Sequence, residues 1–350
     1  MSKPQQIFLI ALILFSLSTS ASAELQRFSS WYPRYQTAFH TIEHTNCSAQ
    51  YNAYLSRKTD NLTQNDPQLA VWDVDSTVTP LINCLLASTP ELYKSMMSSA
   101  QVVLGLMPTL LLSISPSAHE TAMLFVFGDR QFLSFLLTIA SPASPVDPSG
   151  NFYQHVQDLK TSYEWLSADF LLHHNFAIVL LEIALAAAAA ANVLVLSYEI
   201  GMRAVFSFAQ SVQYLPGLWV ALGVTTHLLM TIVLRTRVHI SDPHADRFGF
   251  GTVLSWIKAQ FTASDRSKSI DIQLRERTVA NVLISWFTSM LAAANTLFGI
   301  LLFSSLLFIS VADALFIVVR YVASAVVCRI LVKYELWLVR EQVKLNALMG

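Results

Sequence analysis

Asp73, Asp75 and Thr77 in the stretch VWDVDSTVTP have the types and spacing of a reaction centre, because they follow an apolar run at alternate positions. In phosphatases with an aspartate nucleophile, the first carboxylate attacks phosphorus, the second acts as acid and base, and Mg²⁺ joins the two. That chemistry also needs a Lys and further acidic residues from later strands of a parallel sheet. No later part of the chain alternates strands and helices, so we interpret Asp73 and Asp75 as solvated loop residues and predict no catalytic residue.

Other motifs for catalysis or ligand binding are missing from the sequence. It contains no HExxH, GxSxG or phosphate-loop motif and no Cys/His cluster, so we predict neither a metal nor a cofactor. The formal net charge is -1, and no basic run with interleaved aromatic residues is present. Binding to a phosphate backbone needs such positive charge, so we expect no nucleic-acid partner.

Ionisable residues inside long apolar segments are the other candidates for a functional site. A charged group in the middle of a bilayer costs about 2.5–3.5 kcal/mol, so it usually faces a partner or water. Glu182 and His227 could meet, either as a proton-linked pair or as a buried hydrogen bond that fixes helix register. Asp313 is expected to cap a helix, and Arg320, about 10 Å farther along the same face, needs its own partner. We expect hydrogen bonds between helices from three amides: Asn192, Asn281 and Asn295.

Long apolar runs must position these residues. Hydrophobic residues make up 54% of the 350 residues and charged residues only 13%, whereas soluble domains carry about 25% charged residues. Segments 98–115, 176–196 and 216–234 are each near the length of about 20 residues that spans a bilayer. Segment 279–332 is too long for one helix, and we expect it to break at 310–313. Gly128-Asp129-Arg130 divides segment 120–140, which predicts a re-entrant or interfacial pair of short helices, or a span whose charges lie inside the bundle.

The N-terminal part has the features of an exported segment. Lys3, an apolar stretch and Ala21-Ser22-Ala23 predict a signal peptide that is cleaved after residue 23, although an uncleaved anchor remains an alternative. Asn46 and Asn61 begin N-glycosylation sequons. Cys47 and Cys84 are predicted to form a disulfide, and two free thiols are the other possibility.

The predicted fold class is all-α: a polytopic transmembrane helix bundle with a small disulfide-linked extracytoplasmic N-terminal domain. The N-terminus is expected outside, and the Arg and Lys residues of 235–279 and of the C-terminal tail favour the cytoplasm. Five spans and one membrane-embedded piece satisfy both constraints, and six spans remain possible. The expected parts are a signal peptide (1–23), an extracytoplasmic domain (24–95), a first span with a re-entrant or second span (96–140), a linker loop (141–175), two spans (176–234), a basic cytoplasmic loop (235–279), two spans (280–333) and a cytoplasmic tail (334–350).

Two stretches resemble a group of uncharacterised multi-pass membrane proteins of filamentous fungi. They are INCLLASTPELYKSMMSSAQVVLGLMPTLL (82–112) and FGILLFSSLLFISVADALFIVVRYVASAVVCRI (298–330). The resemblance implies a signal peptide, a short Cys-containing ectodomain and a helical membrane region, and it implies no activity. We therefore expect a glycosylated, non-enzymatic membrane protein of the cell surface or secretory pathway, with the lipid bilayer as its partner. A proton-linked transporter or channel that uses Glu182, His227 and Arg320 is the alternative.

Overall fold

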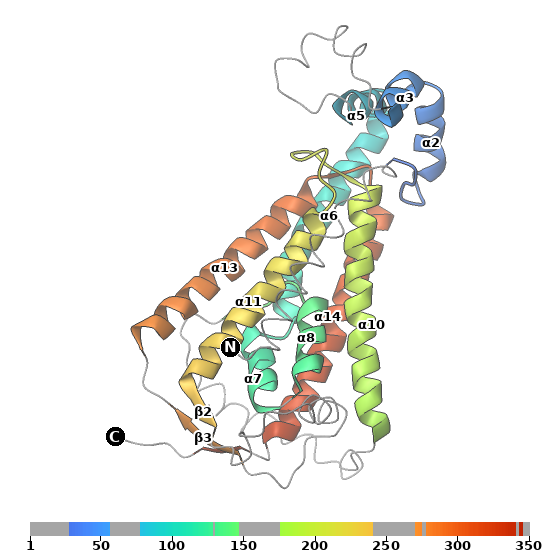
Figure 1. The fold of residues 1–350 in the computed structure, drawn as a ribbon. Coiled ribbons are helices and arrows are strands. Elements are labelled where there is room, and N and C mark those ends of the chain that lie inside the picture. The colour runs from blue at the N-terminus through green and yellow to red at the C-terminus, as the bar shows by residue number, and fades with distance from the viewer. Residues whose placement is uncertain are drawn as a thin grey trace. The chain divides into compact units, whose positions relative to one another are not determined.

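The chain folds into two compact units, each of which combines segments far apart in the sequence (Figure 1). The first unit contains the described residues up to 108, with 195–219 and 298–319, and the second contains those of 109–194, 220–297 and 320–350. In this computed structural model the described residues form ten α-helices and five short strands. They are residues 28–56, 78–128, 130–146, 176–240, 270–274, 278–340 and 343–345.

Five helices are long and apolar enough to cross a membrane, which is the number of spans that the sequence favours. Each contains at least 23 residues, so each is about 34 Å or longer, enough to cross a hydrocarbon core of about 30 Å. Every one of them begins in one unit and ends in the other. They are α6 (Glu91–Ile114), α10 (Phe176–Arg203), α11 (Leu215–Arg237), α13 (Val279–Ser304) and α14 (Val311–Arg340).

The interruption between the last two spans covers residues 305–310, just before the predicted 310–313, and the capping residue is also different. The α13 helix ends at Ser304 and α14 begins at Val311. The Ser310 hydroxyl accepts a hydrogen bond from the Asp313 backbone N–H at 3.2 Å and donates to Asp313 Oδ2 at 2.7 Å. Ser310 is therefore the N-cap, and Asp313 lies in the first turn, where a carboxylate stabilises the positive end of the helix dipole.

Segment 120–140 forms two short helices, α7 (Ala118–Phe127) and α8 (Gln131–Ala140). Ser117 and Glu120 form a reciprocal capping box that starts α7, which satisfies two otherwise unpaired backbone N–H groups. Each helix is about 15 Å long, half of a hydrocarbon core. We call the described residues of 117–146 the α7–α8 hairpin.

The hairpin is closed by two hydrogen bonds of its own. The Ser134 hydroxyl of α8 donates to the Thr121 carbonyl of α7 at 3.0 Å. The Ala118 N–H donates to the Pro145 carbonyl at 3.1 Å, which joins the start of α7 to the segment after α8. The chain therefore forms two short helices that pack together, which is the first of the two arrangements expected from the sequence.

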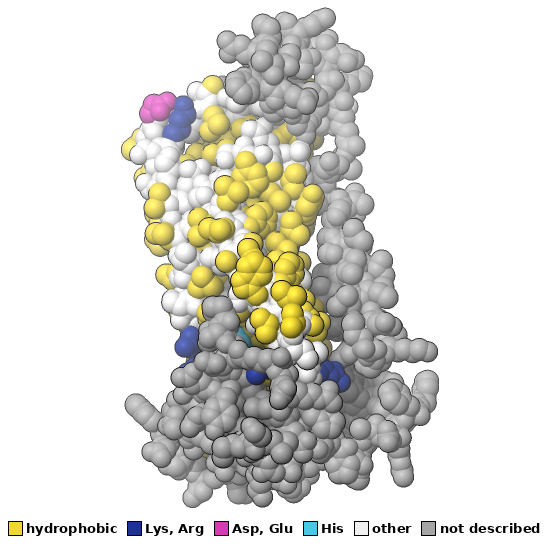
Figure 2. All heavy atoms as spheres, turned by 90° about the vertical axis from the view of Figure 1, so that its left-hand side faces the viewer, with side chains coloured by type: hydrophobic (Ala, Val, Ile, Leu, Met, Phe, Trp, Pro, Cys, Tyr) yellow, Lys and Arg dark blue, Asp and Glu magenta, His cyan; other side chains and the backbone are white. Residues whose placement is uncertain are grey.

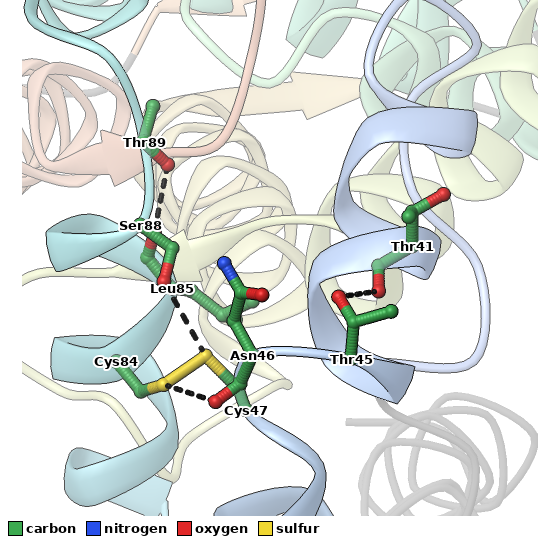
Figure 3. The surroundings of a disulfide bond; sticks show 8 residues. All are labelled: Thr41, Thr45, Asn46, Cys47, Cys84, Leu85, Ser88 and Thr89. Atoms are coloured by element: carbon green, nitrogen blue, oxygen red, sulfur yellow. Dashed lines mark hydrogen bonds between the residues drawn. A yellow bond between two sulfur atoms is a disulfide. The ribbon is translucent and has the colours of Figure 1, made fainter.

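The N-terminal part of the first unit is held by a disulfide and a cluster of aromatic rings. It contains α2 (Gln36–His44), α3 (Ser48–Ser56) and α5 (Val78–Ala87). Figure 3 shows the Cys47–Cys84 disulfide between the start of α3 and α5. The bond confirms the predicted pairing, and it closes a loop with a sequence separation of 37 residues.

Short strands add a feature that the all-α prediction did not include. In the first unit, β1 (Val205–Phe206) pairs antiparallel with β4 (Leu306–Leu307), which joins the α10–α11 connection to the α13–α14 connection. In the second unit, β3 (Ile270–Leu274) pairs antiparallel with β2 (Val238–Ile240) and parallel with β5 (Val343–Leu345). Pairing of backbone groups between distant segments is a tertiary property, and the apolar periodicity of helices gives no sign of it.

The outer faces of the long helices are covered by large apolar side chains. Trp286 of α13 is 62% exposed and Phe287 is 56% exposed. Figure 2, viewed from the side on which α13 lies in Figure 1, shows hydrophobic side chains over much of the described surface and few charged ones. A water-soluble protein rarely exposes so much contiguous apolar surface, so these faces are suited to lipid.

Candidate functional site

The α7–α8 hairpin carries a buried charge at the turn between its helices. Arg130 immediately precedes α8, and its side chain is only 3% exposed. Its Nη1 atom donates a hydrogen bond to Glu182 Oε2 of α10 and also forms an ion pair with Glu335 Oε1 of α14. The Glu182 and Glu335 side chains are 5% and 0% exposed. We call these three residues the Arg130 cluster.

The Arg130 cluster contains one cation for two carboxylates. Among the described residues, neither carboxylate forms an ion pair with a second cation. Within the same part of the chain, Arg130 Nε and Nη2 and Glu335 Oε2 have no hydrogen-bond partner. Buried ionic groups usually have all their hydrogen bonds satisfied, so an incomplete set marks a place where a small ligand could complete it.

The partners of His227 of α11 lie in the hairpin, and Glu182 is not one of them. Its Nδ1 atom lies 2.7 Å from Thr121 Oγ1, and its Nε2 atom lies 3.0 Å from Ser144 Oγ and 3.4 Å from the Ser141 carbonyl oxygen. The imidazole is 2% exposed. The suggested Glu182–His227 pair is therefore replaced by two separate contacts, and both of them hold the α7–α8 hairpin.

The predicted amide hydrogen bonds are present in the second unit. Asn295 Nδ2 of α13 donates to the Pro142 carbonyl of the hairpin at 2.9 Å. Asn192 Nδ2 donates to the Arg320 carbonyl at 3.0 Å, and Arg320 Nε donates to Asn192 Oδ1 at 2.8 Å. Arg320 thus has its own partner, as expected. Asn281 Nδ2 of α13 donates to the Val233 carbonyl of α11 at 3.0 Å.

Polar groups of α10, α11, α13 and α14 therefore all contact one element. Glu182 of α10 and Glu335 of α14 contact Arg130 of the hairpin. His227 of α11 contacts Thr121 and Ser144. Asn295 of α13 contacts Pro142. In an apolar environment such contacts are a main source of specific helix association, because the hydrophobic effect no longer distinguishes protein from lipid. The hairpin is thus the polar centre of the second unit.

A close approach at Gly223 gives a direct test of how the hairpin is held. A Cβ atom on Gly223 of α11 would lie 2.2 Å from the Pro142 carbonyl oxygen. We expect Gly223→Ala to lower the free energy of unfolding by about 1–3 kcal/mol, because the hairpin backbone must shift. Unfolding in detergent micelles would measure it.

Gly217 supplies the control in the same helix. A Cβ atom there has nothing within 4 Å, so Gly217→Ala should be neutral or stabilise by up to about 1 kcal/mol through reduced chain entropy. Equal effects of the two substitutions would mean that α11 and the hairpin do not approach each other as described.

Glu335 was not among the candidates predicted from the sequence, because residues 334–350 were expected to form a cytoplasmic tail. Glu335 lies within α14, which continues to Arg340. The signal that could have found it is the apolar run Ile330-Leu331-Val332 before it and Leu336-Trp337 after it, which extends the helix past the expected boundary at 333. Its partner could not be found in this way, because Arg130 is about 200 residues away.

The first unit contains a third buried carboxyl group. Glu43 of α2 is 1% exposed, and its Oε1 accepts a hydrogen bond from Trp31 Nε1 at 3.0 Å. Burial raises the pKa of Glu43 from 4.5 to about 7, and the Trp31 hydrogen bond offsets part of that rise. The Trp31 ring in turn packs on the Phe308 ring, and their centroids lie 5.2 Å apart. The Phe39 ring also packs on Phe308, with a centroid distance of 5.0 Å.

The raised pKa of Glu43 predicts a pH dependence of stability. A carboxyl whose pKa is higher in the folded state stabilises it fully below the unfolded value and loses that contribution as pH rises through the folded value. Stability should therefore fall by about 2–3 kcal/mol between pH 4.5 and about 7. Glu43→Gln should make the fall smaller by about this amount, as measured by thermal unfolding at a series of pH values.

Glu91→Gln is the control for that experiment, because the Glu91 side chain is 88% exposed. It should leave the fall between pH 4.5 and 7 unchanged. If the fall is as large in the Glu43→Gln protein as in the wild type, Glu43 does not titrate over this range.

Several residues singled out in the sequence lie outside the described residues. They include the signal peptide (1–23), Asp73, Asp75 and Asn61. Asn46 is described and is exposed immediately before Cys47, so its side chain is open to modification. No protein-family model, curated protein or solved structure matches this chain.

Proposed function

We propose that this chain is a non-enzymatic, multi-pass membrane protein of the secretory pathway or plasma membrane. Its disulfide-linked N-terminal domain acts outside the cytoplasm as a sensor or structural element, and it is glycosylated at Asn46 and Asn61. The observation that carries this proposal is the contact between that domain and the connections between spans. Phe308, which joins α13 to α14, is completely buried against Trp31 and Phe39 of the domain.

A second contact links the domain to the other connection. The Thr79 hydroxyl of α5 donates to Gln210 Oε1 in the α10–α11 connection at 2.6 Å. The two connections are themselves joined by the β1–β4 pair. A ligand, a change of pH or a partner that alters the domain would therefore act on the ends of four spans. A sensor requires such a contact between its ligand-binding domain and the elements that respond.

The proposed orientation is supported by how helix ends are distributed between the units. The N-terminal domain, the α10–α11 connection and the α13–α14 connection share the first unit, whereas the α11–α13 connection and the end of α14 share the second. Five crossings would put the N-terminus and the C-terminus on opposite sides of a bilayer. The second group carries the basic residues, which favours the cytoplasm for it.

Glycosylation scanning of the full-length protein in microsomes tests this arrangement. Acceptor sites inserted at 210 should receive glycans and sites inserted at 265 should not, and alkaline carbonate should leave the protein in the membrane. Glycans at 265 would overturn the orientation. Phosphate release that is lost in Asp73→Asn would overturn the assignment as a non-enzyme.

A proton-linked transporter or channel is the second candidate, and the Arg130 cluster favours it. Buried carboxylates in two spans are typical of proton pathways. Glu182→Gln and His227→Ala should abolish a proton-linked flux in reconstituted vesicles without loss of assembly if this function is correct. If they only lower thermal stability, the cluster and His227 serve to hold the hairpin.

A further inference from the structure

We propose that the Arg130 cluster binds one proton, shared by Glu182 and Glu335, at neutral pH. The bound state then contains a guanidinium, one carboxylate and one carboxylic acid, and its net charge is zero. The proposal concerns where a proton resides, so it holds whether or not protons cross the membrane. It is also independent of the sensor role, because the cluster lies entirely in the second unit.

The convergence of both carboxylates on one atom is the first argument. Glu182 Oε2 and Glu335 Oε1 both contact Nη1 of Arg130, so the two carboxyl groups lie close to each other. Two ionised carboxylates that share one site repel each other strongly, and such pairs hold a proton in common. The guanidinium carries a single positive charge, so it cannot neutralise two carboxylates.

The unpartnered oxygen of Glu335 is the second argument. The Glu335 side chain is 0% exposed, and its Oε2 accepts no hydrogen bond from any described residue. A buried ionised oxygen without a donor is costly. Protonation removes that charge, and the O–H group can then donate a hydrogen bond to the neighbouring Glu182 carboxylate.

Other charged groups near the cluster do not replace the proton. Tyr334 is another titratable side chain whose charge acts on Arg130. Ionisation of Tyr334 would add a further negative charge, so it cannot neutralise a carboxylate. His227 is bound to hydroxyl groups of the hairpin, and Arg329 donates to the carbonyl oxygens of 113–115. No described Lys, His or second Arg forms an ion pair with Glu182 or Glu335.

Infrared spectroscopy of the full-length protein in detergent at pH 8 tests the proposal. At this pH an ordinary glutamate is ionised, and Glu43, with a pKa of about 7, is largely ionised as well. The wild type should show the C=O absorption of a buried carboxylic acid. Glu335→Gln and Glu182→Gln should each lose it, because the remaining carboxylate then pairs with Arg130 alone.

Glu91→Gln is the control, because it removes an exposed carboxylate, and it should retain the absorption. A second measurement counts protons released on unfolding at pH 8, where the wild type should release about one proton more than Glu335→Gln. Absence of the absorption in the wild type overturns the proposal, and this result requires no variant to fold. Persistence of the absorption in both glutamine variants also overturns it.

Discussion

Replacement of Arg130 by Met should lower the free energy of unfolding by about 3–5 kcal/mol, the usual cost of removing one partner from a buried ion pair. Glu182 and Glu335 would remain buried without a cation. The loss should increase with pH, because protonation of both carboxyl groups relieves it at low pH. Unfolding in detergent micelles at pH 5 and pH 8 measures both effects.

Two comparisons make the Arg130 prediction specific. Arg203→Met removes a cation that lies 3.9 Å from Glu199 and is 35% exposed, so it should cost less than about 1 kcal/mol. Addition of Glu182→Gln and Glu335→Gln to Arg130→Met should restore much of the lost stability, because no buried charge remains. A triple variant as unstable as Arg130→Met would show that packing of the Arg130 stem, and not charge, is what stabilises the hairpin.

Loss of the Cys47–Cys84 disulfide should destabilise the N-terminal domain by about 3–4 kcal/mol. The bond closes a 37-residue separation, and the domain has few helices of its own with which to bury a core. The double variant Cys47→Ser/Cys84→Ser should therefore expose Trp31 and the ring cluster around Phe308. Limited proteolysis and thermal unfolding of the membrane-inserted protein would measure the change.

Cys328→Ser is the control for the disulfide, because Cys328 is a free, buried thiol in α14. It should leave proteolysis of the N-terminal domain unchanged. Reducing agent should make the wild type resemble the double variant, and it should not affect the double variant further. Equal protease resistance of wild type and double variant would contradict the prediction.

Glu43 and the Arg130 cluster are buried ionisable sites in different units, and we expect them to have different roles. Glu43 titrates near pH 7 in the first unit and is bonded to the ring that covers Phe308. The proposed sensor therefore contains a group whose charge changes over the pH range of the secretory pathway or cell exterior. The Arg130 cluster belongs to the second unit, where it stabilises the α7–α8 hairpin.

The sequence by itself was sufficient for the number of long helices and for most of their limits. Length and apolar composition are local properties, so α10 begins at the predicted residue 176 and the last apolar run divides close to 310. The charges at 128–130 predicted two short helices for the same reason. The disulfide also followed from the sequence, because two of the three cysteines lie in the one segment that was expected to be exported.

Only the tertiary structure decided which polar groups meet. Glu182 and His227 lie on consecutive spans, yet one binds Arg130 and the other binds Thr121 and Ser144, because the hairpin supplies partners for both. Glu335 joins Arg130 across about 200 residues, and the β1–β4 pair joins connections about 100 residues apart. Hydrophobic periodicity determines which face of a helix is apolar, but it carries no information on which helices become neighbours.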